Sequence, residues 1–290
     1  MAKSPIHTLG QEIGLFLEQA MLPVFQSVAD TNGFYLDFVG KDRPARKGKK
    51  VKWEDIYGSS HDLDFLIEKN GSDTNMGQPV AIIEAAWRRY TKHSKNKAQE
   101  IQAAVLPIAD KYSHLKPFLG AVIAGDFTAP SLKQLNASGF NIIYFNYANV
   151  VKVFLKFGVD IYFDEDTEDD DGWKKLEAFR KLTSSKKDAV TTELLNLHEK
   201  EINSFTSKLK EALDRQIKQI FISPLFGENY SFTDMTNAKK FIYDYNSEPN
   251  NEELTFAKYQ IVIHYTNGDK LEGSFRSKDR AISFLNSVLH

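Results

Sequence analysis

The chain has 290 residues, with 37 Lys and Arg against 39 Asp and Glu, 42% hydrophobic residues and no cysteine. The absence of cysteine excludes disulfides, thiolate zinc sites, iron–sulfur clusters and cysteine nucleophiles. The composition is typical of a folded globular protein, and no apolar run approaches the roughly 20 residues of a membrane span. No secretory leader pattern begins the chain, so we expect a cytoplasmic protein without membrane contact. A net charge of −2 predicts no overall attraction to nucleic acid, so any such binding must use local patches.

Charge is concentrated in three short blocks. Residues 41–52 hold seven Lys and Arg in twelve positions, residues 88–97 hold five and a histidine, and residues 164–171 hold seven acids in eight. Blocks of like charge are usually solvent-exposed. The acidic block lacks the glycine and ligand spacing of an EF-hand loop, so we interpret it as a solvated loop. The basic blocks are candidates for binding phosphate.

The first half of the chain alternates helical and strand patterns. Apolar residues recur at helical spacing over 9–30 and stop before Asn32-Gly33. The elements that follow are strands at 34–39, 62–68 and 79–86, a helix over 94–112, a strand at 118–125, a helix over 130–137, a strand at 140–147, a short helix or strand at 149–157 and an extended segment at 159–163. Ser94 suits a helix N-cap, and Pro107 predicts a kink. This order predicts an α/β fold with three layers and a mixed sheet.

The second half begins with helical patterns over 172–182 and 186–216. The second of these has one apolar stripe among many charges, so we expect a long helix that packs on one side only and connects domains or pairs with its copy in a dimer. On this basis the chain divides into a core over 1–170, a helical connector over 171–216 and a C-terminal α+β module over 217–290.

The C-terminal module contains an apparent internal repeat. The segment Gln219–Ile222 matches Gln260–Ile263, and the residues after each match also correspond, although a chance match is the alternative. Each copy has the pattern strand, turn, strand, helix, and Asn267-Gly268 is a strong hairpin signal. Two such ββα units would form one four-stranded sheet backed by two helices, with residues 246–251 as the linker.

Two acidic residues stand out in adjacent predicted strands. Asp64 is followed by Phe-Leu-Ile, and Glu84 comes after the apolar run Val80–Ile83. Adjacent strands bring such carboxylates close together, and two poorly solvated acids are costly unless something pairs them. A divalent ion does so, because Mg²⁺ binds through one or two carboxylates plus water and substrate phosphates. Asp62 lies on the same strand face as Asp64 by period two and is a further ligand or a solvated acid.

The basic block 88–97 follows Glu84 almost directly. Cations beside a metal-binding acid pair suit a phosphate backbone, and a helix that starts at Ser94 would point N–H groups at a phosphate. Two neighbouring histidines could bind metal and two aromatic residues could stack on bases, whereas the simpler interpretation makes the histidines surface residues and the aromatics core. These four residues are His61, His93, Trp87 and Tyr90.

The order helix with an acid, strand with Asp64, turn, strand ending in Glu84, then helix resembles the PD-(D/E)xK nuclease superfamily. The resemblance covers about residues 9–163 and implies a restriction-endonuclease-like fold and Mg²⁺-dependent hydrolysis of phosphodiesters, with Mn²⁺ as a substitute ion. On the first helix the matching acid is Glu12 or Glu18.

The sequence departs from this family at one position. The family places a lysine two residues after the second acid, where this chain has Ala86. Some members supply the lysine from the following helix, for which Lys97 is our first choice, then Lys92, then Lys95. The alternatives are that Ala86 is an inactivating substitution, or that the domain binds DNA without cutting it.

We therefore interpret the chain as a metal-dependent DNA endonuclease of the type II restriction or phage-defence kind. Asp64 and Glu84, with Asp62, would bind the metal, and double-stranded DNA would be held by the basic residues Arg88, Arg89, Lys95, Lys47, Lys49 and Lys50. A homodimer is expected because cutting both strands needs two active sites. The C-terminal module would read the DNA sequence or form the dimer. Glycine-rich nucleotide-binding motifs, a Gly-x-Ser-x-Gly elbow and a His-Glu-x-x-His motif are absent from the sequence, so no nucleotide cofactor is expected.

Overall fold

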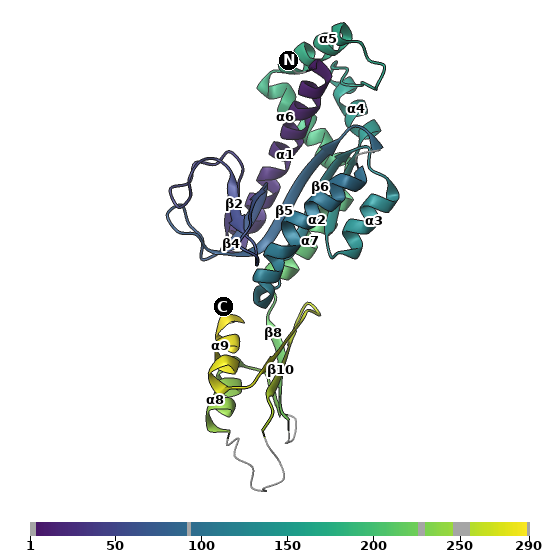
Figure 1. Ribbon diagram of the computed structural model, residues 1–290. Helices are drawn as coiled ribbons and strands as arrows, with labels where there is room; N and C mark the ends of the chain where they lie inside the picture. The colour runs from purple at the N-terminus through teal and green to yellow at the C-terminus, as the bar shows by residue number, and fades with distance from the viewer. Residues whose placement is uncertain (1–3, 92–93, 226–229, 246–255, 289–290) are drawn as a thin grey trace. The chain divides into compact units, whose positions relative to one another are not determined.

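The computed structural model describes residues 4–91, 94–225, 230–245 and 256–288. The chain forms two compact units, which are described separately (Figure 1). Unit 1 comprises residues 1–111 and 117–210, and unit 2 comprises residues 112–116 and 211–290. The expected connector over 171–216 is therefore wrong for most of its length, because its helices pack within unit 1.

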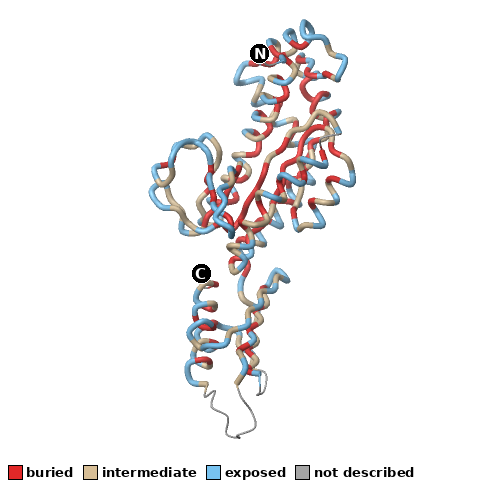
Figure 2. The backbone as a smooth tube through the Cα atoms, in the orientation of Figure 1, coloured by how far each residue is buried: buried red, intermediate tan, exposed pale blue. Residues whose placement is uncertain are grey.

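Unit 1 is built on a five-stranded mixed sheet in the order β1-β4-β5-β6-β7. Its strands are β1 (Tyr35–Phe38), β4 (Phe65–Lys69), β5 (Gln78–Arg88), β6 (Phe118–Gly125) and β7 (Asn141–Asn146). Strand β4 pairs antiparallel with both β1 and β5, whereas β5, β6 and β7 run parallel. The central strand β5 is buried almost throughout, as expected of a strand covered on both faces. Figure 2 shows this strand as a nearly continuous buried segment. The predicted α/β class with a mixed sheet is confirmed.

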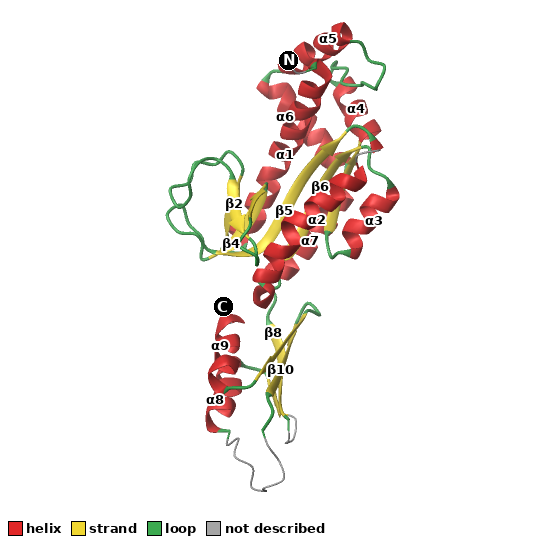
Figure 3. Ribbon diagram, in the orientation of Figure 1, coloured by secondary structure: helices red, strands yellow, loops and turns green. Residues whose placement is uncertain are grey.

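Helices cover both faces of this sheet (Figures 1 and 3). They are α1 (Pro5–Thr31), α2 (Ser94–Lys111), α3 (Ala129–Ala137), α4 (Tyr147–Lys156), α5 (Asp169–Arg180), α6 (Ser184–Leu197) and α7 (Glu199–Leu213). Helix α1 approaches the sheet closely, because a Cβ at Gly10 or Gly14 would lie only 3.2–3.3 Å from Trp87. Helix α7 lies on the same face, where Phe205 would meet a Cβ at Gly120. Helices α2 and α3 cover the opposite face.

Three local predictions differ from the structure. The strand expected over 62–68 is interrupted at Asp64 and forms β3 (Ser60–Leu63) and β4. The basic block contains strand β2 (Val51–Glu54), which pairs with β3 as a separate two-stranded sheet. The helix expected over 186–216 is two helices, α6 and α7, that meet at His198. The His198 side chain is buried against Phe145, with ring centroids 4.7 Å apart. The helix is therefore interrupted at the residue whose side chain packs into the core.

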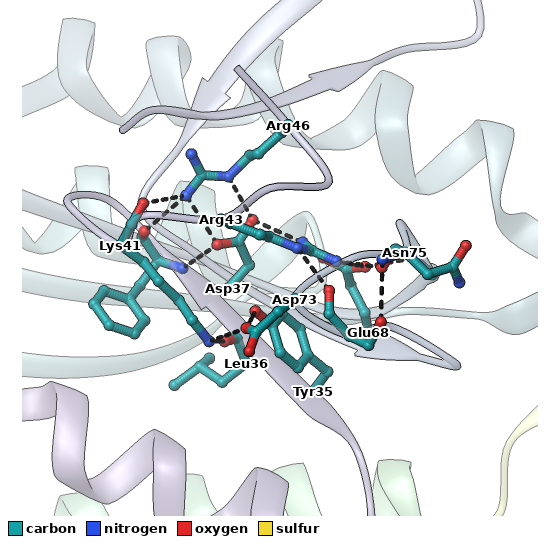
Figure 4. Close-up of polar contacts among 12 residues, drawn as sticks. Tyr35, Leu36, Asp37, Lys41, Arg43, Arg46, Glu68, Asp73 and Asn75 are labelled. Carbon is teal, nitrogen blue, oxygen red and sulfur yellow. Dashed lines mark hydrogen bonds and ion pairs between the residues drawn. The ribbon is translucent and has the colours of Figure 1, made fainter. Parts of the chain in front are cut away.

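A buried ionic cluster fixes the basic block to the sheet (Figure 4). Arg43 is fully buried and donates to Glu68 through both terminal nitrogens, at 2.5 and 3.0 Å, and to Asp37 at 2.9 Å. Arg46 donates to both oxygens of Asp37, at 2.8 and 2.9 Å. Burial alone would raise the pKa of Asp37, but hydrogen bonds from Arg46 and Arg43 outweigh it and lower that pKa below its ordinary value. Two of the seven cations in the block are therefore structural.

Unit 2 has the architecture that the repeat predicts. Its elements are the 3₁₀ turn Ser113–Leu115, β8 (Ile217–Pro224), β9 (Tyr230–Phe232), α8 (Met235–Asp244), β10 (Tyr259–Tyr265), β11 (Lys270–Phe275) and α9 (Lys278–Val288). The four strands form one antiparallel sheet in the order β11-β10-β8-β9, and both helices bury their apolar side chains against it. The proposed linker 246–251 lies outside the described residues.

The buried cluster generates a stability prediction for unit 1. Replacing Arg43 by Ala leaves Asp37 and Glu68 buried without their shared cation, so we expect a loss of about 3–5 kcal/mol in the free energy of unfolding. Urea denaturation of the two proteins measures this loss. Lys47→Ala, in the same block but exposed, should change stability by less than about 0.5 kcal/mol. Equal effects of the two substitutions would contradict a structural role for Arg43.

Candidate active site at the divergence of two strands

The two acids singled out in the sequence meet where strands β4 and β5 separate. In the antiparallel register Phe65 lies opposite Ile83, so the next pair along the ladder is Asp64 and Glu84. Beyond this point β5 continues to Arg88 paired only with β6, since Asp64 leaves the strand geometry. The divergence therefore opens the sheet at the position of the two carboxyl groups.

Hydrogen bonds hold both side chains in place. The Ala85 amide donates to Asp64 Oδ2 at 2.7 Å, and the Asp64 amide donates to Glu84 Oε1 at 3.4 Å. Each acid thus accepts from the backbone of the opposite strand and replaces the ladder bonds lost at the divergence. Glu84 is only 6% exposed and follows three residues that are fully buried.

Burial raises the pKa values of both acids and so disfavours their ionised forms. Burial is the main cause that raises the pKa of Asp64, against the Ala85 hydrogen bond and the charge of Lys97. Burial also raises the pKa of Glu84 well above its ordinary value, and the charge of Asp64 raises it further, while Lys97 opposes both. Without a bound cation the pair therefore favours retaining a proton.

Of the two helix acids considered, the structure associates Glu18 with the site. Burial, followed by the charge of Asp64, raises the pKa of Glu18 to about 7. Glu12 instead accepts from Arg180 Nε at 2.9 Å and from its Nη2 at 2.6 Å, on helix α5. Glu18 is therefore the third carboxyl group whose charge acts on this site.

Lys97 is the lysine whose charge reaches both acids. It lies in the first turn of α2, is partly buried, and lowers the pKa values of Asp64 and Glu84 electrostatically. Lys95 points to solvent, and Lys92 lies outside the described residues, as does His93. Ser94 is the first residue of α2, with its hydroxyl donating to the Thr91 carbonyl at 2.8 Å, and α2 continues through Pro107 to Lys111.

The two arginines after Glu84 have different surroundings. Arg88 is half-exposed, and its Nη2 lies 3.5 Å from Glu100, whose same oxygen lies 3.5 Å from Lys97. Arg89 is mostly buried: it donates to the Phe163 carbonyl and to Asp126, both at 2.5 Å, and stacks over the Tyr147 ring. Arg88 therefore remains near the site, whereas Arg89 binds the segment that follows α4 and the loop that follows β6.

Glu100 is a residue of the site that was not predicted from the sequence. Its carboxylate bridges Arg88 and Lys97. The spacing of three residues from Lys97 on a predicted helix could have indicated the contact.

The remaining candidates lie on the arm formed by residues 41–63. Asp62 is exposed and pairs with Lys50 at 2.5 Å and with Lys52 at 3.7 Å, so its carboxylate is already neutralised. Lys47 and Lys49 are exposed. His61 lies 2.8 Å from Asp55 within the β2–β3 hairpin and is structural. The expected metal ligand Asp62 thus has a different set of partners from Asp64 and Glu84.

A cavity of about 740 Å³ lies beside the divergence. Its lining includes Glu18 and Gln11 from α1 and Ala86, Trp87 and Arg88 from β5. Trp87 packs on α1 as a wall of this cavity and is only partly buried, so it is not a core residue in the strict sense. Ala86, the position where a lysine was expected, borders open space.

The carboxyl pair fits a hard divalent cation. Two carboxylates opposite one another, Glu84 buried and Asp64 partly buried, each have a raised pKa, supply oxygen ligands and would gain from a cation in place of a proton. Among the described residues, no group of three or more His, Asp or Glu side chains is arranged to hold a metal ion. The site would therefore bind an ion through two carboxylates, and water and substrate would supply the other ligands.

Comparison of the chain with protein-family models, curated proteins and solved structures finds no match in any of the three. Over the part of the chain that the structure describes, no helix combines the length and apolar character of a membrane span.

The raised pKa of Glu84 generates a prediction about stability and pH. In metal-free solution the folded protein keeps a proton that the unfolded chain loses above pH ~4.5, so stability falls as pH rises through this window. Glu84→Gln removes this pH-dependent loss of stability. We therefore expect the free energy of unfolding of Glu84→Gln, relative to that of the wild type, to increase by on the order of 1 kcal/mol between pH 4.5 and 8. Urea denaturation in EDTA at both pH values measures it. The control Glu177→Gln alters an exposed site, so its free energy of unfolding should differ from that of the wild type by the same amount at both pH values. A pH-independent difference for Glu84→Gln would contradict the prediction.

Proposed function

We propose that the protein is a Mg²⁺-dependent endonuclease that hydrolyses DNA phosphodiester bonds. The observation that carries the proposal is the pair of the buried Glu84 and the partly buried Asp64, opposite one another where the strands separate, with the charge of Lys97 acting on both. Two acids and one cation from these elements are the set that the PD-(D/E)xK resemblance implies, and we infer the restriction-endonuclease-like fold on the same grounds.

Each residue has a role set by its surroundings. Asp64 and Glu84 would hold the ion, whose chemistry is to neutralise phosphate charge and to make a bound water more acidic. Lys97 would hold the attacking water or the scissile phosphate beside the pair, replacing the lysine absent at position 86. Arg88, on the same edge of β5, would bind a neighbouring phosphate. Glu18, with its pKa near neutrality, is suited to accept a proton from water at this edge.

The arm over residues 41–63 supplies the contact with the DNA backbone. The buried Arg43 cluster holds this segment in place, and Lys47, Lys49 and Lys50 face outward from it. Exposed lysines on a fixed scaffold bind phosphates without sequence preference. A homodimer would place a second active site on the opposite strand, as a restriction or phage-defence nuclease requires.

A nucleic-acid-binding module without catalysis is the second candidate. The observation that favours it is Ala86, which borders the cavity where the family has its lysine. The position of Lys97 favours the enzyme, and the following two experiments separate the candidates.

The first experiment compares two lysines of the same helical turn. Lys97→Ala should lower metal-dependent cutting of plasmid DNA by about 10²–10⁴-fold, the usual loss when a proton-transfer group is removed. Lys95→Ala, at the exposed position that directly follows Ser94, should stay within about twofold of the wild type. Cutting is measured with Mg²⁺, with Mn²⁺ and with EDTA, and Glu84→Ala serves as the inactive reference. Wild-type protein that binds DNA but never cuts it would establish the binding module.

The second experiment places a lysine on strand β5, at position 86, in place of Lys97 on α2. In the Lys97→Ala background, Ala86→Lys places an ammonium two residues after Glu84, with open space beside it. We expect cutting to recover at least about tenfold, because a positioned cation acts through space from either element. Circular dichroism confirms that the double variant is folded. A folded double variant as inactive as Lys97→Ala would show that Lys97 does not occupy the role of the missing lysine.

A further inference from the structure

The hairpin of β2 and β3 extends from the candidate active site as a separate two-stranded arm. Its strands pair from Val51 opposite Leu63 to Glu54 opposite Ser60, and Asp64 of the site follows Leu63 directly. One face of the hairpin is buried through Val51, Trp53 and Leu63. The arm is therefore attached to unit 1 along its length, and its tip is the turn over residues 55–59.

The turn is held rigidly from within. The carboxylate of Asp55, only 3% exposed, accepts from the amides of Tyr57 at 2.8 Å and Ser59 at 2.9 Å, while His61 binds its other oxygen at 2.8 Å. The amide of Ile56 donates to the Pro107 carbonyl of α2 at 3.2 Å. A turn with this many backbone bonds keeps one conformation.

This rigid turn displays apolar side chains to solvent. Tyr57 is 81% exposed and Ile56 is 52% exposed. Hairpin turns favour Gly, Asn, Asp and Ser, and in the turn 55–59 only Ile56 and Tyr57 depart from that preference. Neither side chain is needed to shape the turn, because its fixed contacts come from backbone atoms and from Asp55.

The charge around the tip does not oppose a polyanion. Each acid of the hairpin 51–63 is paired, because Lys111 binds Glu54, Lys50 and Lys52 bind Asp62, and His61 binds the buried Asp55. In the preceding segment Arg43 and Arg46 are bound to Asp37 and Glu68, whereas Lys47 and Lys49 are exposed. The exposed aromatic ring therefore stands on a hairpin whose carboxylates are all paired and which follows two exposed lysines, an environment that a nucleic acid can approach.

The tip is also at a suitable distance from the site. Lys97 lies at the start of α2 and Pro107, which holds the turn, lies about 15 Å further along that helix. This corresponds to roughly four or five base steps of ~3.4 Å. A base at that distance from the scissile phosphate would reach Tyr57.

We propose that Tyr57, supported by Ile56, stacks on an unpaired nucleobase a few nucleotides from the cleaved bond, so that the enzyme prefers DNA with a single-stranded or splayed segment over a continuous duplex. The proposal rests on the nuclease function proposed above. An exposed ring on a rigid turn loses little conformational freedom on binding, and aromatic stacking accepts any base because every base presents a π face.

The test uses the full chain with Glu84→Ala, so that binding is measured without cutting. Three fluorescent probes are compared by anisotropy at one salt concentration: a 30-base-pair duplex, the same duplex with a splayed end, and a 30-nucleotide single strand. We expect tighter binding to the splayed and single-stranded probes. Tyr57→Ala should lower the affinity for the splayed and single-stranded probes by about 5- to 100-fold and leave the affinity for the duplex within about twofold of the parent's. Tyr57→Phe should keep the parent's preference for the splayed and single-stranded probes.

Trp173→Ala is the matched control, because Trp173 is another exposed aromatic residue of unit 1 and lies on α5. It should leave all three affinities unchanged. Folding is not at risk in Tyr57→Ala, since the amide of residue 57 keeps its bond to Asp55.

Three outcomes would overturn the proposal. A preference that persists in Tyr57→Ala, or no preference in the parent, removes the stacking role while the nuclease function stands. Self-association of the parent that Tyr57→Ala abolishes, measured by sedimentation, assigns the tip to a second copy of the chain. Failure to bind any of the probes, together with no cutting by the wild type, removes the proposed function as well.

Discussion

The end of the β4–β5 ladder at Asp64 is the constraint on which the candidate site depends. Up to Phe65 the two strands satisfy each other's backbone groups, and beyond it the amide of Ala85 needs another acceptor. The Asp64 carboxylate supplies it, which turns one acid inward beside Glu84. A close pair of acids, one buried and one partly buried, is thus the consequence of ending an antiparallel ladder while the parallel pairing of β5 with β6 continues. The repulsion between the two carboxylates is what creates a demand for a cation.

A second constraint sets how the basic block can act. Arg43 and Arg46 face inward to Asp37 and Glu68, and their bonds to backbone carbonyls fix the path of the chain between β1 and β2. Burying a guanidinium requires several acceptors at once, and this cluster provides them. The lysines of the same block then face outward on a segment whose geometry is already determined. One run of like charge therefore contains two structural arginines and a set of exposed lysines at 47, 49, 50 and 52.

The sequence predicted the parts of this structure that depend on periodicity. Glu84 was found because an acid after a continuous apolar run is unusual, and the four-stranded C-terminal sheet followed from the repeat. The break at Asp64 and the helix interruption at His198 could not be predicted, because each depends on a partner distant in sequence. The strand Val51–Glu54 pairs locally with β3, and it was missed because it lies at the end of the basic block. The same reason separates Glu18 from Glu12: both lie on one helix, and only the packing of α5 shows that Arg180 occupies the latter.

Under the proposed function, the position of Lys97 would represent a motif whose spacing has changed while its electrostatics stay the same. A motif with the cation two residues after the acid relies on strand geometry, in which alternate side chains share a face. Helix α2 packs on the face of the sheet to which Glu84 belongs, so a lysine in its first turn reaches the same pair of acids. Coulomb interactions depend on distance and burial, and not on which element carries the charge. Position 86 can hold a small residue when the cation comes from α2, and Ala86 lines the wall of the cavity. Under the proposed function, the departure at Ala86 follows from a cation relocated to α2, and the spatial arrangement of the two acids and Lys97, rather than their linear spacing, defines the site.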